Sequence, residues 1–265
     1  MLNRLLITGA AGRVASLVTP RLGGFYTELR LSDLARPETM PEGAEFVPCD
    51  LQDFESVMSL VEDCDGIVHL GGIAEEDTFG AILGANIEGV HYLYEAARLC
   101  GRPRIVFASS NHAVGFYRQD QRLDARTLPR PDSLYGVSKV FGEAMADLYH
   151  RKFGIETAIL RIGSCFEAPV DRRMLATWFS AADFARLIER VFTVHRLGCP
   201  VIYGVSDNDG VWWDNAAASY LGWVPQDSSR HFAALFADER LAADDPRALY
   251  QGGLFTKASN HGEKS

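Results

Sequence analysis

Over the first 165 residues, short apolar runs alternate with longer amphipathic stretches, and this rhythm constrains the fold more than any other feature. The apolar runs favour β-strands at Arg4–Thr8, Glu28–Ser32, Glu45–Pro48, Gly66–Leu70, Arg104–Ala108 and Glu156–Ile162. The stretches between them favour helices and include Asp53–Val61, Phe79–Cys100 and Ser133–Phe153. Apolar strands separated by helices are typical of a parallel sheet covered on both faces. We therefore predict an α/β fold with a doubly wound parallel sheet.

Beyond residue 162 the alternation becomes less regular. The elements expected there are a helix begun by Ser180, a short strand, a short aromatic helix and a last helix capped by Asp227 or Ser228: Ser180–Val194, Pro200–Tyr203, Trp212–Leu221 and a stretch ending near Glu239. We therefore predict two parts packed as one compact unit. Residues 1–165 form the sheet core, and residues 166–265 form a smaller lobe with the C-terminal helices.

The charge and the cysteine content exclude several classes of protein. With 26 Lys and Arg against 35 Asp and Glu, the net charge of −9 argues against nucleic acid and anionic membranes as partners. The five cysteines are odd in number and form no Cys-x-x-Cys pair, so we expect reduced thiols, a cytoplasmic location and no metal site. We also expect no leader peptide and no membrane span, which needs about 20 apolar residues.

A glycine-rich turn at residues 8–15 follows the first predicted strand and opens a helix. Gly9 permits a tight turn, and Gly12 lets backbone N–H groups approach a pyrophosphate at the positive end of the helix. The second strand ends at Asp33, 24 residues after Gly9, where a carboxylate can accept hydrogen bonds from both hydroxyls of an adenosine ribose. Because an ionised Asp33 repels a 2′-phosphate, we expect NAD rather than NADP in a Rossmann-type site.

Two further strand ends carry residues compatible with a nucleotide. Asp50 ends the third strand and can accept from an adenine amino group, while Gly71 and Gly72 let the backbone after the fourth strand approach the ribose. The cations Arg13 and Arg36 lie close to this region and would favour NADP instead. The predicted nucleotide contacts at these strand ends are Gly9, Gly12, Arg13, Val14, Asp33, Leu34, Asp50, Leu51, Leu70, Gly71 and Gly72.

Tyr135 and Lys139 are four residues apart at the start of a predicted helix and therefore project from one face. A tyrosine with an ordinary pKa near ~10 is a poor base at neutral pH. The Lys139 ammonium and the positive end of a dinucleotide would both favour the phenolate. Ser110 ends the fifth strand and can hold the reacting oxygen by a hydrogen bond. An amphipathic helix with an incidental Tyr and Lys is the alternative interpretation of the spacing alone.

These motifs together resemble the short-chain dehydrogenase/reductase superfamily, in the extended branch that contains nucleotide-sugar epimerases and dehydratases. The resemblance covers residues 4 to about 165 and rests on Thr8–Ala15, Asp33, Asp50, Gly71, Gly72, Asn86, Ser110, Tyr135 and Lys139. It implies a catalytic set of Ser110, Tyr135 and Lys139. It further implies that Asn86 orders the catalytic end of the sheet, and that the cofactor side also includes Asn86, Tyr135, Lys139 and Cys165.

Five longer segments resemble the bacterial uronate dehydrogenases, a family whose likeness extends over nearly the whole chain: RIVFASSNHAVG (104–115), LYGVSKVFG (134–142), RIGSC (161–165), RMLATWFS (173–180) and GVWWDN (210–215). This resemblance implies NAD-dependent oxidation of C1 of D-glucuronate or D-galacturonate, in pyranose form, to the aldarolactone in hexuronate catabolism. It also implies a homo-oligomer.

The same resemblance implies the substrate contacts. Arg173 would bind the carboxylate, since a planar guanidinium suits that group. The sugar hydroxyls would contact Ser110, Asn111, His112 and Ser164. The family often has a serine where this chain has Ala74, so one contact at Ala74 is lost or shifted.

Three alternatives stay open at this point. A nucleotide-sugar epimerase or dehydratase shares the fold and the catalytic residues, although the dehydratases carry an acidic pair where this chain has Asn111 and His112. A dehydrogenase of neutral aldoses or of other alcohols would use the same machinery. A redox-sensing NAD-binding regulator would keep the glycine turn but typically lacks the pair of Tyr135 and Lys139.

Overall fold

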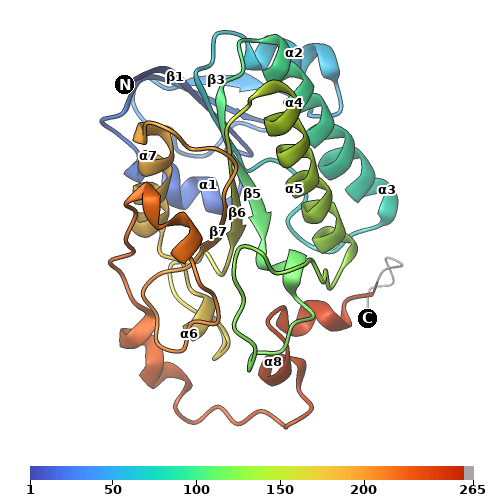
Figure 1. The fold of residues 1–265 in the computed structure, drawn as a ribbon, viewed down its shortest axis with the longest axis vertical. Coiled ribbons are helices and arrows are strands. Elements are labelled where there is room, and N and C mark those ends of the chain that lie inside the picture. The colour runs from blue at the N-terminus through green and yellow to red at the C-terminus, as the bar shows by residue number, and fades with distance from the viewer. Residues whose placement is uncertain (260–265) are drawn as a thin grey trace.

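The computed structural model describes residues 1–259 and is built around one parallel β-sheet (Figure 1). Within those residues the sheet has seven strands in the order β3-β2-β1-β4-β5-β6-β7. Their bounds are β1 Leu2–Thr8, β2 Tyr26–Asp33, β3 Glu45–Pro48, β4 Gly66–His69, β5 Arg104–Ser110, β6 Thr157–Ile162 and β7 Val201–Gly204. The order reverses between β1 and β4, as in a doubly wound sheet, and every pairing is parallel. The predicted fold class is confirmed.

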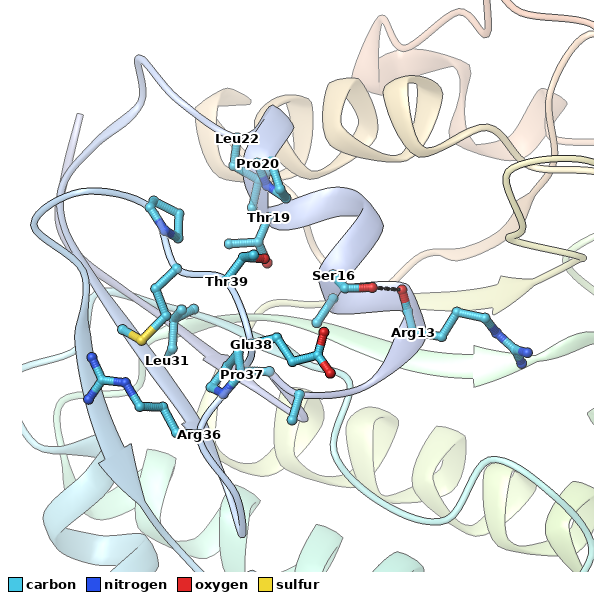
Figure 2. A pocket seen from close by; sticks show the side chains of 15 residues that line it. Arg13, Ser16, Thr19, Pro20, Leu22, Leu31, Arg36, Pro37, Glu38 and Thr39 are labelled. Carbon is cyan, nitrogen blue, oxygen red and sulfur yellow. Dashed lines mark hydrogen bonds between the residues drawn. The ribbon is translucent and has the colours of Figure 1, made fainter.

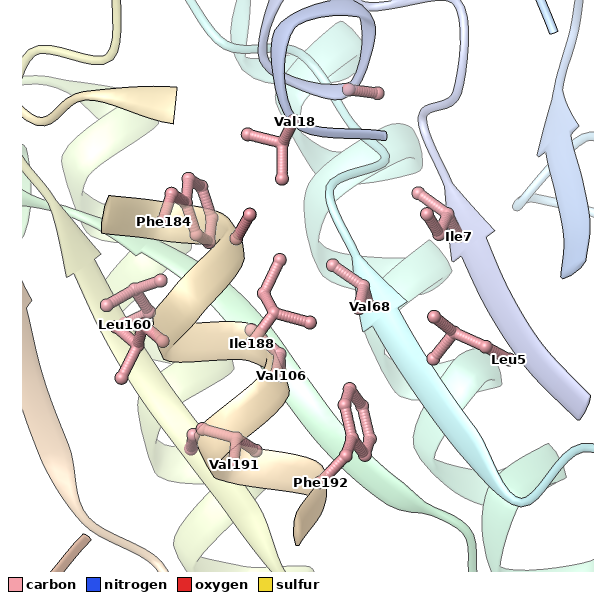
Figure 3. Packing of buried hydrophobic residues seen from close by; sticks show 14 of the residues in the cluster. Leu5, Ile7, Val18, Val68, Val106, Leu160, Phe184, Ile188, Val191 and Phe192 are labelled. Atoms are coloured by element: carbon pink, nitrogen blue, oxygen red, sulfur yellow. The ribbon is translucent and has the colours of Figure 1, made fainter. Parts of the chain in front are cut away.

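Helices cover both faces of the sheet, as the continuous apolar strands predict. Three helices lie on one face, α2 Phe54–Val61, α4 Gly89–Leu99 and α5 Leu134–Phe153, and two lie on the other, α1 Arg13–Val18 and α7 Ala181–Thr193 (Figure 1). Each face has its own cluster of buried apolar side chains. In Figure 3 the apolar side of α7, with Phe184, Ile188 and Phe192, packs against β1, β4, β5 and β6. Together these layers bury the sheet and leave its carboxyl edge open.

The single helix expected over Phe79–Cys100 is wrong in detail, because this stretch contains three elements. They are α3 Phe79–Ile82, the π-helix η2 Leu83–Glu88 and α4. The π-helical turn carries Asn86, whose side chain makes two hydrogen bonds with the backbone of Ile73. Its Oδ1 accepts from the Ile73 N–H at 2.8 Å, and its Nδ2 donates to the Ile73 carbonyl at 2.9 Å. Tertiary contacts therefore override the local helical pattern, and π turns often occur at functional sites.

The C-terminal part is less regular than the core. The helix begun by Ser180 is confirmed, since the Ser180 hydroxyl accepts from the Asp183 N–H. The two later helices are wrong in type, because both are 3₁₀ segments, η4 Ala216–Leu221 and η5 Ser229–Phe236. The remaining short elements are η1 Thr19–Arg21, η3 Asn111–Val114, α6 Met174–Thr177, α8 Pro246–Leu249 and η6 Gly253–Lys257.

The helix α7 and the strand β7 lie beyond residue 165 and yet complete the layers of the sheet. The predicted lobe therefore supplies part of the core as well as the segments below the sheet in Figure 1. Residues 260–265, the end of the predicted lobe, lie outside the described residues. Among residues 1–259, no helix combines the length and the apolarity that crossing a bilayer requires.

Candidate active site

Two adjoining cavities open at the carboxyl edge of the sheet, where the strand order reverses. One has a volume of about 300 Å³ and the other about 620 Å³. Ligands of doubly wound folds bind at this edge. The two cavities share six lining residues: Arg13, Val14, Leu70, Gly72, Ile73 and Ala74. An extended ligand can therefore occupy both.

The smaller cavity collects the residues predicted to contact a nucleotide at the strand ends. Its lining includes Gly9, Gly12, Arg13, Val14, Asp33, Leu34, Asp50, Leu51, Leu70, Gly71 and Gly72. Gly9 has a φ of +69°, and a Cβ there would lie 2.6 Å from the backbone nitrogen of Gly71. Only glycine allows the turn after β1 to approach the turn after β4 so closely. The cavity therefore keeps an exposed backbone surface of the kind that a pyrophosphate needs.

Asp33 closes one side of this cavity and is fixed by backbone donors. Its carboxylate accepts from the Ala11 N–H at 3.0 Å and from the Leu34 N–H at 2.7 Å. A carboxylate has about four acceptor positions, so it can still accept from two ribose hydroxyls. Asp50 caps its own turn, with Oδ1 accepting from the Gln52 N–H at 2.9 Å. These residues fit the adenosine half of a dinucleotide.

A third cavity, of about 720 Å³, lies between α1 and the segment after β2 (Figure 2). Arg13 lines all three cavities. In Figure 2 its side chain points away from Glu38 and Thr39 on the opposite wall, and its guanidinium carbon lies 4.3 Å from the ring centre of Phe166. Arg13 is thus turned toward the two cavities of the candidate site.

The larger cavity contains the predicted catalytic residues. Tyr135 and Lys139 are each only 7% exposed, and the Lys139 Nζ lies 5.4 Å from the centre of the Tyr135 ring. Ser110 lines the same cavity, and a hydrogen bond from its side chain favours the ionised form of Tyr135. The helix α5 presents the tyrosine and the lysine on one face, as their spacing predicts. The structure therefore brings a phenol, an ammonium and a hydroxyl together at the edge of the sheet.

In the protein by itself, burial opposes the ionisation of Tyr135 that neighbouring positive charges would favour. Burial raises the pKa of Tyr135 to about 12, which outweighs the hydrogen bond from Ser110, and the charge of Asp132 raises it further. Burial also lowers the pKa of Lys139 to about 8, because a buried ammonium loses its hydration. The sequence reveals that Lys139 lies four residues from Tyr135. It does not reveal that both side chains lose their hydration when the chain folds.

Asn86 is placed beneath the site rather than in it. It is 2% exposed, and its Nδ2 donates to the Ser138 hydroxyl at 2.9 Å. Ser138 in turn donates to the Tyr135 carbonyl at 2.7 Å. Asn86 therefore ties the backbone of Ile73 to the first turn of α5, and it lines neither of the two site cavities. Its expected contact with the cofactor stays a prediction.

The larger cavity also holds the residues expected to contact a substrate. The lining includes Ala74, Ser110, Asn111, His112, Ser164 and Arg173, together with Cys165. The Arg173 side chain is 8% exposed, and burial lowers the pKa of its guanidinium. Within residues 1–259 its polar contacts are few: Nη1 donates to the Gln251 carbonyl at 2.8 Å, and Nε lies 4.0 Å from the Asp171 carboxylate. A buried cation with N–H donors to spare is suited to an anionic ligand.

The other polar side chains of this cavity are held by neighbouring residues. His112 Nδ1 lies 2.8 Å from the Asp132 carboxylate, so this nitrogen donates and the ring is oriented. The Ser164 hydroxyl lies 2.8 Å from that of Thr177. Burial raises the pKa of the Cys165 thiol to about 12, which fits a packing role.

Sequence reasoning missed several residues of this cavity. The C-terminal segment contributes Gly252, Leu254 and Phe255 to the lining. The adjacent Gln251 carbonyl accepts from Arg173 and Asn111, and the Phe255 ring stacks on His112 with centres 3.8 Å apart. No periodicity marks this segment in the sequence. Asp132 and Glu76 were also missed, although the Asp-Ser pair before α5 is a typical cap signal.

This chain is similar in sequence and structure to several known proteins. A sequence model of the NAD dependent epimerase/dehydratase family matches residues 5–186. Uronate dehydrogenase of Pseudomonas putida is 51% identical over 97% of this chain and 96% of its own length. The crystal structure of a glucuronic acid dehydrogenase from Chromohalobacter salexigens has a TM-score of 0.97 and 52% identity, and covers 100% of both chains.

The chain belongs to the uronate dehydrogenase family. Within that family, a variant of the Agrobacterium tumefaciens uronate dehydrogenase has been solved with NAD, and it superimposes with a TM-score of 0.95 at 48% identity over 98% of this chain and 99% of that one. The family resemblance expected from the five segments is thus confirmed. NAD is the cofactor of this NAD-dependent family, and the glycine turn, Asp33 and the two connected cavities of this chain fit it.

Proposed function

We propose that this protein oxidises the C1 hydroxyl of the pyranose form of D-glucuronate or D-galacturonate to the aldarolactone, with NAD, in the breakdown of hexuronates. One observation supports the substrate class most directly. The same cavity holds a buried guanidinium, that of Arg173, and the pair of Tyr135 and Lys139. A uronate has both features that this arrangement requires, a carboxylate and an oxidisable hydroxyl.

The chain's own residues carry the proton and orient the sugar in this proposal. The Tyr135 oxygen removes the proton of the C1 hydroxyl, while Ser110 donates a hydrogen bond to the same substrate oxygen. Lys139 lies over the Tyr135 ring and stabilises the phenolate electrostatically. When bound, NAD supplies a hydride acceptor and a positive charge. Loss of the hydroxyl proton and of the C1 hydride leaves a C=O group, which is the lactone carbonyl.

The residue assignments of this proposal are those expected from the sequence. The sugar is contacted by Ala74, Ser110, Asn111, His112, Ser164 and Arg173. The dinucleotide is contacted by Gly9, Gly12, Arg13, Val14, Asp33, Leu34, Asp50, Leu51, Leu70, Gly71, Gly72, Tyr135, Lys139 and Cys165, with Asn86 in support. Residues 1–165 then carry the cofactor and the catalytic residues, and residues after 165 carry most of the substrate end.

The test is a spectrophotometric assay of the reduced cofactor. Glucuronate and galacturonate are compared with glucose and with a UDP-sugar, each with NAD and with NADP. We expect turnover of the two uronates with NAD. Faster turnover of glucose would favour a neutral aldose dehydrogenase. Consumption of the UDP-sugar, followed by chromatography because epimerases and dehydratases release no net reduced cofactor, would favour one of those enzymes; either result would refute the proposal.

We further infer that the protein is a cytoplasmic homo-oligomer. All five cysteines are free, in keeping with a reducing compartment. Large apolar side chains are exposed on α3, η2 and α5, among them Phe79 at 63%, Leu83 at 36%, Val137 at 50% and Leu148 at 42%. The three elements contact one another, so these side chains lie on neighbouring helices. Light scattering of the purified protein tests this inference, and a monomer at micromolar concentration would contradict it.

A further inference from the structure

The structure points to Glu76 as a positioning residue for the catalytic tyrosine. We propose that its carboxylate holds the first turn of α5 against the wall of the substrate cavity and so sets the place of Tyr135. The inference rests on the proposed function, in which Tyr135 is the base. Within residues 1–259, Glu76 makes no hydrogen bond to the phenol and no ion pair with Lys139; it acts through the main chain of Tyr135.

The contact is bidentate. Oε1 of Glu76 accepts from the Leu134 N–H at 2.9 Å, and Oε2 accepts from the Tyr135 N–H at 2.8 Å. The first N–H groups of a helix have no partner within the helix. Here the hydroxyl of Ser133 accepts from the next one, that of Gly136, at 2.9 Å. A local cap therefore satisfies one donor, and a carboxylate 58 residues away along the chain satisfies the two before it.

The segment that carries Glu76 is tied to the same turn of α5 at its other end. Asn86 binds both the N–H and the carbonyl of Ile73 and also donates to Ser138, which bonds the Tyr135 carbonyl. The main chain of Tyr135 is thus held on its N–H side by Glu76 and on its carbonyl side by Ser138. Residues 73–76 also line the larger cavity. One short segment therefore joins the cavity wall to the catalytic residue.

This arrangement goes beyond the stabilisation of a helix. A charged acceptor at a helix N-terminus is favourable in any helix. Here the same carboxylate fixes Tyr135 relative to residues 73 and 74, which line both the nucleotide cavity and the substrate cavity. A displacement of about 1 Å in a catalytic group can lower the rate on the order of 100-fold. Loss of the clamp is therefore expected to affect turnover more than binding.

The decisive variant is Glu76→Gln, which keeps the size of the side chain but replaces one acceptor oxygen by an NH₂ group. We expect kcat for glucuronate to fall by roughly 10- to 100-fold, with KM for glucuronate and Kd for NAD within twofold of wild type. Hydrogen exchange of the Leu134 and Tyr135 amides should accelerate. The shorter carboxylate in Glu76→Asp should restore part of kcat, because it can still reach one amide.

Asp77→Asn is the matched control. It removes the same charge one residue away, and the Asp77 carboxylate bonds the neighbouring Thr78 N–H rather than α5. We expect wild-type kcat for this variant. Wild-type kcat in Glu76→Gln, or a loss of kcat accompanied by an equal loss of NAD and glucuronate binding, would overturn the proposal.

The failure of this inference can be told apart from a failure of the proposed function. If the wild-type enzyme does not oxidise uronates, the proposed function is wrong, whatever the variants do. Amide exchange at Leu134 and Tyr135 then still tests the clamp, because unchanged exchange in Glu76→Gln would refute it. If Glu76→Gln does not fold, Glu76→Asp provides the same comparison of kcat with KM.

Discussion

Replacement of Arg173 by methionine is the sharpest test of the substrate assignment. The side chain is 8% exposed and lies in the cavity of Tyr135 and Lys139. Its Nη1 donates to the Gln251 carbonyl at 2.8 Å, and its Nε lies 4.0 Å from the Asp171 carboxylate. Since an arginine has five N–H donors, most of them stay available to a ligand. Methionine fills a similar volume without a charge.

The size of the effect follows from the burial. Removal of one partner of a buried charge pair costs about 3–5 kcal/mol, because the other charge is left without compensation. A uronate carboxylate deprived of Arg173 would lose this amount of binding, equivalent to a decrease in kcat/KM of roughly 100- to 5,000-fold. We expect most of the loss in KM. The variant itself should be as stable as wild type or more stable, because a buried cation has been removed.

The assay compares glucuronate with its uncharged amide, glucuronamide, for wild type, Arg173→Met and Arg172→Met. Arg172 is the matched control, since it is the neighbouring arginine and is exposed. We expect Arg173→Met to bring kcat/KM for glucuronate down to that for the amide, and Arg172→Met to behave as wild type. An unchanged preference of Arg173→Met for the charged substrate would refute the reasoning.

Three further predictions concern the catalytic helix α5. Tyr135→Phe should leave the Kd for NAD, measured by calorimetry, within threefold of wild type and lower kcat by at least ~100-fold; parallel losses of both would contradict its role as the base. Lys139→Met should abolish turnover yet raise the free energy of unfolding at pH 7 by up to ~3 kcal/mol, because the folded-state pKa of Lys139 is about 8 instead of the ordinary 10.5. Below pH 8 the wild-type protein bears the full cost of burying the Lys139 ammonium, and between pH 8 and 10.5 that cost declines. Urea titrations should therefore show that the extra free energy of unfolding of the variant decreases across this pH range. Glu143→Leu should destabilise the protein by about 3–5 kcal/mol, because the Arg161 side chain is only 3% exposed and its Nη2 loses the Glu143 carboxylate that lies 2.8 Å away. In thermal melts, the double variant Glu143→Leu, Arg161→Leu should recover most of that loss.

The strands were predictable because their signal is local. Ile105, Val106 and Phe107, for example, form a continuous apolar run, and a strand buried on both faces needs nothing more. The helical stretch over residues 79–100 shows where local signals fail. Its apolar pattern is that of one helix, but the bonds of Asn86 to Ile73 on another segment reshape it into a π-helical turn.

In the candidate site, too, local motifs were predictable and contacts between distant segments were not. Gly9, Tyr135 and Lys139 were predicted from short motifs, since the chemistry of each depends on its own turn or helix. Asp33 was predicted from its place at the end of the next strand. Other contacts of the site join segments far apart in the chain. The bond from Tyr135 to Glu76 spans 59 residues, and that from Arg173 to the Gln251 carbonyl spans 78. No periodicity or motif records such a pairing, so these partners become visible only in the folded chain.

The electrostatics of Tyr135 show why burial matters as much as the choice of neighbours. Because burial raises the pKa of Tyr135 to about 12, almost all of the phenol groups are protonated at neutral pH. Lys139 by itself does not reverse this, because its own pKa has fallen to about 8 and it shares the same dry surroundings. Tyr135 can therefore act as a base at neutral pH only when further positive charge enters the cavity. It follows that the apparent pKa of Tyr135 should fall on addition of NAD and stay unchanged on addition of the uncharged reduced nicotinamide form. Because the chain has nine tyrosines, the signal of Tyr135 is taken as the difference in tyrosinate absorbance between wild type and Tyr135→Phe. An equal effect of both forms would mean that a change in packing, rather than charge, activates the phenol.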